Sequence, residues 1–186
     1  MKKIILLDPG HGGDQPGACR DNTREAALNL DIALRIPPLL PDCEVFLTRD
    51  DDRTVSLLDR VNKQQQIGAN FFISIHCDAS ESRTPQGYTV YHHPGSEKGK
   101  ALATSILRAL DSAGLGRISR GVLSPDNPLT PHVESFFVLA HTTCPACLVE
   151  CGFMSNPEEL AWLQVSENRQ ALAMAIARGI EIQEKE

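Results

Sequence analysis

Long runs of positive charge and long runs of apolar residues are both missing from this sequence. It has no stretch of five or more basic residues, and its 24 acidic and 18 basic residues give a formal charge of −6. This balance argues against nucleic acid as the main partner and provides no polybasic membrane anchor. The N-terminal apolar run from Ile4 to Leu7 is far shorter than the core of a secretory signal, and a membrane-spanning helix needs about 20 apolar residues. We therefore expect neither an export signal nor a membrane anchor.

Cysteine is too sparse for a disulfide scaffold, because only six cysteines occur among 186 residues. Cys144 and Cys147 have CxxC spacing, and Cys151 follows four residues later. A thiol redox motif and a structural zinc knuckle are the two functional interpretations. However, the motif leads into a predicted strand, and no second CxxC pair completes a zinc site. We predict mostly reduced, buried thiols, and a thiol redox protein remains an alternative function.

The length and the order of the predicted elements indicate one α/β domain over residues 1–186. Apolar runs typical of strands alternate with segments of helical periodicity. The predicted strands cover 3–7, 44–48, 71–75, 87–92, 136–140 and 146–150, and the predicted helices cover 22–36, 56–69, 96–112, a short segment from 157, and 167–182. The stretch from Gly114 to Ser135 is predicted to be a loop because it is rich in Gly, Pro, Ser and Asp. We expect a mainly parallel, mixed sheet of about six strands with helices on both faces.

Titratable side chains stand at the ends of three of the predicted strands, where turn residues without such chemistry are usual. His11 follows the first strand in a glycine-rich loop, His76 follows the third strand, and Glu150 ends the last strand. Ligands of open α/β sheets bind beyond the carboxyl ends of the strands, so these groups are expected to converge. Two histidines and a carboxylate would form a catalytic zinc set, and a further carboxylate could act as general base. Glu25 and Glu150 are the candidates for the two acidic roles, and position alone does not decide between them.

Each of these residues also has a purely structural interpretation. Glu25 stands three residues after Asn22 and could close a capping box at the start of a helix. His76 could be a hydrogen-bonded histidine at a strand end. Glu150 could form a buried ion pair with an arginine, since an unpaired buried carboxylate is costly.

Other polar residues near the predicted strand ends are weaker candidates. His92 and His93 are the best substitutes if one ligand is wrong, but neighbouring side chains of an extended chain point in opposite directions. At most one of them is therefore expected near the site. Asp8 and Ser74 are candidates for orienting a ligand imidazole.

Five segments of the chain resemble the zinc-dependent N-acetylmuramoyl-L-alanine amidases of the type-3 family. They occur in the family's order, and the resemblance covers about residues 3–182. The segments are Asp8-Pro9-Gly10-His11-Gly12-Gly13, Glu25-Ala26-Ala27-Leu28-Asn29-Leu30, Leu47-Thr48-Arg49, Ser74-Ile75-His76 and Val149-Glu150-Cys151-Gly152-Phe153-Met154-Ser155-Asn156.

The resemblance implies that His11, Glu25 and His76 hold one catalytic Zn2+ and that Glu150 is the catalytic carboxylate. It also implies hydrolysis of the amide between N-acetylmuramic acid and L-alanine in peptidoglycan, carried out here by a monomer at the cell wall or in the periplasm. A phage-type lysin, a domain processed from a secreted precursor and export by another route would each explain the missing export signal. A catalytically silent peptidoglycan-binding domain of the same fold is the alternative.

The chain departs from the family pattern beside the expected site. His76 is followed by Cys77-Asp78-Ala79 where members usually have Ala-Asn-Ala, and Ala140 stands where an arginine is common. These changes affect the expected substrate contacts and hydrogen bonds, but not the ligand set. Some regulated members cover the zinc with a long helix, which the three prolines between Leu123 and Ser135 exclude here. We therefore predict an unblocked site that needs no activator.

Overall fold

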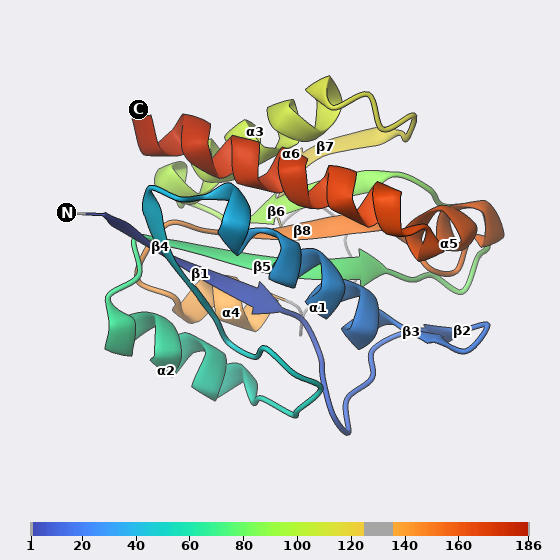
Figure 1. Ribbon diagram of the computed structural model, residues 1–186, viewed down its shortest axis with the longest axis horizontal. Coiled ribbons are helices and arrows are strands. Elements are labelled where there is room, and N and C mark those ends of the chain that lie inside the picture. The colour runs from blue at the N-terminus through green and yellow to red at the C-terminus, as the bar shows by residue number, and fades with distance from the viewer. Residues whose placement is uncertain (1, 125–135, 186) are drawn as a thin grey trace.

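The computed structural model of this chain describes residues 2–124 and 136–185 (Figure 1). Its centre is a six-stranded sheet with the strand order β4-β1-β5-β8-β6-β7. The sheet strands are β1 (Lys3–Pro9), β4 (Cys43–Leu47), β5 (Phe71–Asp78), β6 (Tyr88–His92), β7 (Ser119–Leu123) and β8 (Ala146–Phe153). The helices are α1 (Glu25–Arg35), η1 (Pro37–Leu39), α2 (Leu57–Ile67), α3 (Glu97–Ser112), α4 (Phe137–His141), α5 (Pro157–Gln164) and α6 (Ser166–Lys185). No helix of the described ranges is long and apolar enough to cross a bilayer.

The sheet is mixed, as predicted. The strands β4, β1, β5 and β8 are parallel neighbours, whereas β6 runs antiparallel to β8 and pairs in parallel with β7. The four parallel strands therefore end at one edge of the sheet, which we call the carboxyl edge. β8 is the last strand in the chain, yet it lies between β5 and β6. The expected α/β domain with a mainly parallel sheet of about six strands is confirmed.

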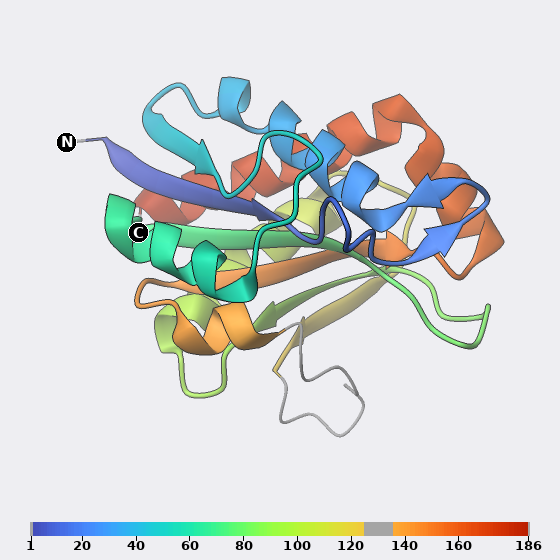
Figure 2. The same cartoon turned by 90° about the horizontal axis from the view of Figure 1, so that it is seen from below.

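Helices cover both faces of the sheet (Figure 2). The larger hydrophobic core joins one sheet face to α1, α3, α5 and α6, with Ile73 and Ile75 of β5 pointing into it. A smaller core joins the other face to α2 and α4 through residues such as Val61 and Val138. Because side chains alternate along a strand, His76 leaves β5 on the face opposite Ile73 and Ile75. The site described below therefore opens on the face that α2 and α4 cover.

Two of the predicted elements are wrong. The segment predicted as the strand 136–140 is the helix α4, because five apolar residues are too few for periodicity to separate a strand from a helix. The expected loop from Gly114 to Ser135 contains β7, whose pairing with β6 outweighs the low strand preference of its Ser-Arg-Gly start. The remainder of that predicted loop, at 125–135, lies outside the described residues.

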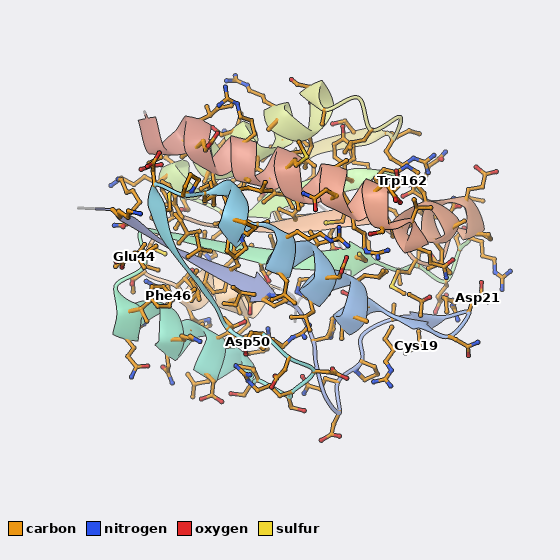
Figure 3. All side chains as sticks on the ribbon, viewed as in Figure 1. Cys19, Asp21, Glu44, Phe46, Asp50 and Trp162 are labelled. Atoms are coloured by element: carbon orange, nitrogen blue, oxygen red, sulfur yellow. The ribbon has the colours of Figure 1, made fainter. Side chains whose placement is uncertain are left out.

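A short hairpin precedes α1 and was not predicted. It consists of β2 (Cys19–Arg20) and β3 (Thr23–Arg24), which are antiparallel, and Figure 3 shows Cys19 and Asp21 on it. The helix α1 begins only at Glu25, after Arg24 as N-cap, and no side chain caps it. The capping box proposed between Asn22 and Glu25 is therefore not formed, so the structural interpretation of Glu25 is wrong.

Candidate metal centre and active site

The loop after β1 brings His11 to the carboxyl edge. β1 ends at Pro9, and the N–H of Gly10 donates to the carbonyl of Ile75 at 2.9 Å, which ties the loop to β5. His11 then adopts a positive φ of 61°, a left-handed conformation that is uncommon for a residue with a side chain. Gly10 lies against the imidazole of His76, and a Cβ at position 10 would overlap the ring. Glycine is thus needed for this close approach of the two histidine-bearing segments.

Three side chains from separate elements converge at this edge. Glu25 is the first residue of α1, and its carboxylate lies between the two imidazoles. Its Oε2 is 3.2 Å from Nε2 of His11, and its Oε1 is 3.0 Å from Nδ1 of His76. One ligand atom from each residue lies within 4.8 Å of the others. The structure brings His11 and His76 together, as expected from their places after the strands, and it puts Glu25, a ligand implied by the family resemblance, between them. The three side chains together could hold a metal ion.

The surroundings of Glu25 favour its ionised form. Burial alone would raise the pKa of Glu25, but the hydrogen bonds and charges of His11 and His76 outweigh it and hold the pKa well below the usual 4.5. The backbone N–H groups of Ala18 and Cys77 also donate to the carboxylate, at 3.0 and 3.3 Å. An ionised carboxylate is the form that binds a metal ion.

Glu150 enters the site from β8. It is the direct register partner of His76 in the parallel pair of β5 and β8, and it is only 8% exposed. Burial raises the pKa of Glu150 well above the usual 4.5, and the carboxylates of Asp78 and Glu25 add to this effect. Its Oε2 has no hydrogen-bond partner among the described residues, and no arginine there pairs with it. The alternative of a structural ion pair is therefore wrong.

A pocket opens beside the two imidazoles on the face covered by α2 and α4. Its volume is about 480 Å³. His11 and His76 form part of its wall, so a molecule inside it would contact both imidazoles. The other lining residues are Asp8, Gly10, Gln15, Ser56, Leu57, Arg60, Ser74 and Val138.

Asp8 and Ser74 do not orient an imidazole, in contrast to the expectation from the sequence. The Asp8 carboxylate instead accepts hydrogen bonds from Arg60 Nη1 at 2.6 Å and from the hydroxyls of Thr48 and Ser74, both at 2.7 Å. Burial would raise the pKa of Asp8, but these partners together keep it below the usual 3.8. Arg60 was not predicted from the sequence. Its place beside Val61, on the buried side of a predicted helix, could have indicated a buried charge with a carboxylate partner.

His92 and His93 stay away from the site. Because β6 is antiparallel to β8, its carboxyl end reaches the opposite edge of the sheet, where His92 pairs with Cys147. Nδ1 of His92 is 2.9 Å from the carbonyl oxygen of His93. Neither residue belongs to the group of potential metal ligands found among the described residues.

The cysteines form no disulfide and no metal cluster within the described ranges. Cys147 and Cys151 are buried in the larger core, as predicted from their even spacing. Burial also raises the pKa of the half-buried Cys144 to about 12, so its thiol is protonated at neutral pH. A protonated thiol is a weak nucleophile, which argues against the thiol redox interpretation.

An α/β domain with two imidazoles and a carboxylate at the carboxyl edge, and a further buried acid beside them, has the features of a metal-dependent hydrolase. The model of one protein family, described as N-acetylmuramoyl-L-alanine amidase, matches residues 5–182. The chain therefore belongs to this family.

Individual relatives agree with this assignment. The chain is 33% identical to the N-acetylmuramoyl-L-alanine amidase LytC of Bacillus subtilis over 95% of its length, and 34% identical to the probable cell wall amidase LytH of Staphylococcus aureus over 97%. It spans only 34% and 58% of these two relatives, respectively. The solved catalytic domain of CwlV, an amidase from Bacillus (Paenibacillus) polymyxa, superposes with a TM-score of 0.89 at 32% identity, and 98% of each chain is covered.

Proposed function

We propose that this domain hydrolyses the amide bond between N-acetylmuramic acid and L-alanine in peptidoglycan with one catalytic Zn2+. The observation that carries the proposal is the convergence of His11, Glu25 and His76 beside the buried acid Glu150. Family membership supports the same reaction, since LytC is named for it. The domain would act as a monomer on peptidoglycan at the cell wall or in the periplasm.

The donor set fits zinc. Two imidazole nitrogens and one carboxylate oxygen are a common ligand combination of catalytic zinc sites, which keep one position open for water or substrate. The three donor atoms lie within 4.8 Å of one another, and no cysteine belongs to the group. When bound by His11, Glu25 and His76, Zn2+ would lower the pKa of water to about 7 and polarise the scissile carbonyl.

The two acids are suited to different roles. Glu25 is held ionised by both imidazoles, whereas the pKa of Glu150 is raised. Among the described residues, Glu25 belongs to the group of donor atoms that could hold one metal ion, and Glu150 does not. This geometry favours Glu25 as ligand and leaves Glu150 beside it as general base, which position in the sequence did not decide.

Glu150 would carry the proton between two steps of the reaction. One carboxylate oxygen takes the proton of the attacking water, and the protonated acid then gives this proton to the nitrogen of the leaving L-alanine. No serine or cysteine nucleophile is needed. The pocket beside His11 and His76 would hold the part of the substrate next to the scissile bond.

The test uses the purified protein, intact cell-wall sacculi and no added protein. We expect about one zinc per chain by elemental analysis and the release of new L-alanine N-termini from the sacculi. Release without an activator would also support the unblocked site. A zinc-loaded protein that binds sacculi without cutting them would instead identify a silent wall-binding domain, and a protein without zinc would overturn the metal assignment.

A further inference from the structure

Arg49 is a fully buried arginine whose guanidinium has no carboxylate partner in the described part of the chain. It is 0% exposed, and every hydrogen bond that it donates ends on a backbone carbonyl. Burial lowers its pKa, because an ionised group in the protein interior is costly unless an opposite charge pairs with it. The cost of burying this charge makes the carbonyl groups that Arg49 binds the feature to explain.

The bonds of Arg49 connect the two segments that carry His11 and Glu25. Nε donates to the carbonyl of Pro9 at 3.0 Å, and Nη2 donates at 2.8 Å to the carbonyl of Gly10 and at 2.8 Å to that of Ala26. The first two carbonyls directly precede His11, and Ala26 directly follows Glu25. One rigid, planar group thus spans the loop after β1 and the first turn of α1.

Arg60 acts on the same loop from α2. It is 2% exposed, and its Nη2 donates to the carbonyl of His11 at 2.8 Å, while Nη1 donates to the carbonyl of Pro9 at 2.9 Å and to the Asp8 carboxylate. His11 has the left-handed backbone conformation described above, which costs free energy unless its surroundings enforce it. The bond to its carbonyl holds the residue in that conformation.

We infer that Arg49 and Arg60 are positioning residues that set the separation of the His11 and Glu25 donor atoms before a metal ion binds. Neither guanidinium donates to a donor atom of the metal centre in the described structure, so both act through the backbone. The inference rests on the proposed function, because it assumes that this group of side chains binds zinc. Partners beyond the ligand shell typically change metal affinity by about 10- to 100-fold.

The experiment compares three conservative variants of the full chain. Arg49→Lys and Arg60→Lys keep the positive charge but lose the planar group that reaches several carbonyls at once. Arg169→Lys is the control, since Arg169 of α6 is also mostly buried and donates to the carbonyl of Leu163 at 2.7 Å. Its other partner, the Asp31 carboxylate, lies on α1 six residues after Glu25, and within the described ranges Arg169 donates to neither Glu25 nor the loop that carries His11. Zinc affinity is measured by competition with a fluorescent chelator, and Co2+ replaces zinc for an absorption spectrum of the ligand geometry.

We expect Arg49→Lys and Arg60→Lys to weaken zinc binding by about 10- to 100-fold and to change the Co2+ spectrum, with Arg169→Lys within about twofold of the parent. Thermal unfolding of each metal-free variant separates a general loss of stability from a loss of affinity. Folded lysine variants with parental affinity and spectrum would overturn the inference, as would variants that cannot fold at all, because the two arginines would then serve the fold. A parent protein that binds no zinc would instead overturn the proposed function.

Discussion

His76 and Glu150 face each other across two neighbouring parallel strands, β5 and β8, and both side chains leave the same face of the sheet. This register places a candidate ligand and a candidate proton carrier side by side through backbone hydrogen bonds alone. Their separation is therefore a property of the sheet and does not depend on a flexible loop.

Replacement of Glu150 should remove activity without removing the metal. In Glu150→Gln, we expect zinc content to stay at the parental level and the turnover number to fall by about 100- to 10,000-fold, because the amide cannot accept a proton. Release of L-alanine N-termini measures turnover. Glu44→Gln is the control, since Glu44 is exposed on β4 toward the opposite edge of the sheet (Figure 3). Unchanged turnover in Glu150→Gln would remove this residue from the mechanism.

Replacement of a proposed ligand should remove the metal as well as the activity. Glu25→Ala and His76→Ala each leave two of the three donors, so we expect zinc to be lost on dialysis and activity to fall with it. Elemental analysis of the dialysed proteins measures the metal. Full zinc occupancy in either variant would show that the ligand set is wrong.

The contact between Gly10 and His76 predicts that one added methyl group at position 10 weakens zinc binding. In Gly10→Ala, the new Cβ overlaps the His76 imidazole and must displace it, so we expect zinc affinity to fall by about 10-fold or more. Gly114→Ala is the control, because apart from its chain neighbours no atom of the described residues lies within 4 Å of a Cβ at that position, although its φ of 63° makes alanine strained there. Chelator competition gives both affinities, and equal values for the two variants would contradict the prediction.

The environment of Asp8 predicts a pH dependence of stability. Its pKa in the folded protein lies below the usual 3.8, so its contribution to stability is complete above that value and is lost as the pH falls toward the folded pKa. Asp8→Asn leaves Arg60 without its charge partner, and we expect a loss of about 3 kcal/mol at neutral pH. The variant should also show a weaker decline of stability in acid. Urea unfolding of the metal-free protein between neutral pH and pH ~3 measures both effects, with the exposed Asp42→Asn as control.

Much of the site was predictable because its residues stand at the ends of apolar runs. His11, His76 and Glu150 each follow or end such a run, and the parallel strands then bring them to one edge. The proposed division of roles between Glu25 and Glu150 was not predictable from position. It depends on which neighbours surround each carboxylate, and those neighbours come from distant parts of the chain.

The errors in the predicted secondary structure also arise from contacts and lengths that the local sequence does not show. The helix α4 is too short for its sequence to display a period, and β7 owes its conformation to pairing with β6. That His92 lies away from the site agrees with the expectation that at most one of His92 and His93 approaches it, and the direction of a single strand, β6, decides which edge His92 reaches. The hydrogen bonds of Arg49 end on backbone carbonyls, which every residue has, so the sequence does not show which ones Arg49 binds.

The position of β8 in the sheet constrains how this domain can be assembled. The strand that carries Glu150 fills the gap between β5 and β6, so until residues 146–153 have left the ribosome both of those strands keep an unpaired edge. His11, Glu25 and His76 emerge much earlier. A nascent chain would thus contain all three proposed ligands long before it contains the proposed proton carrier, so the proposed hydrolysis could begin only after the last strand has been inserted.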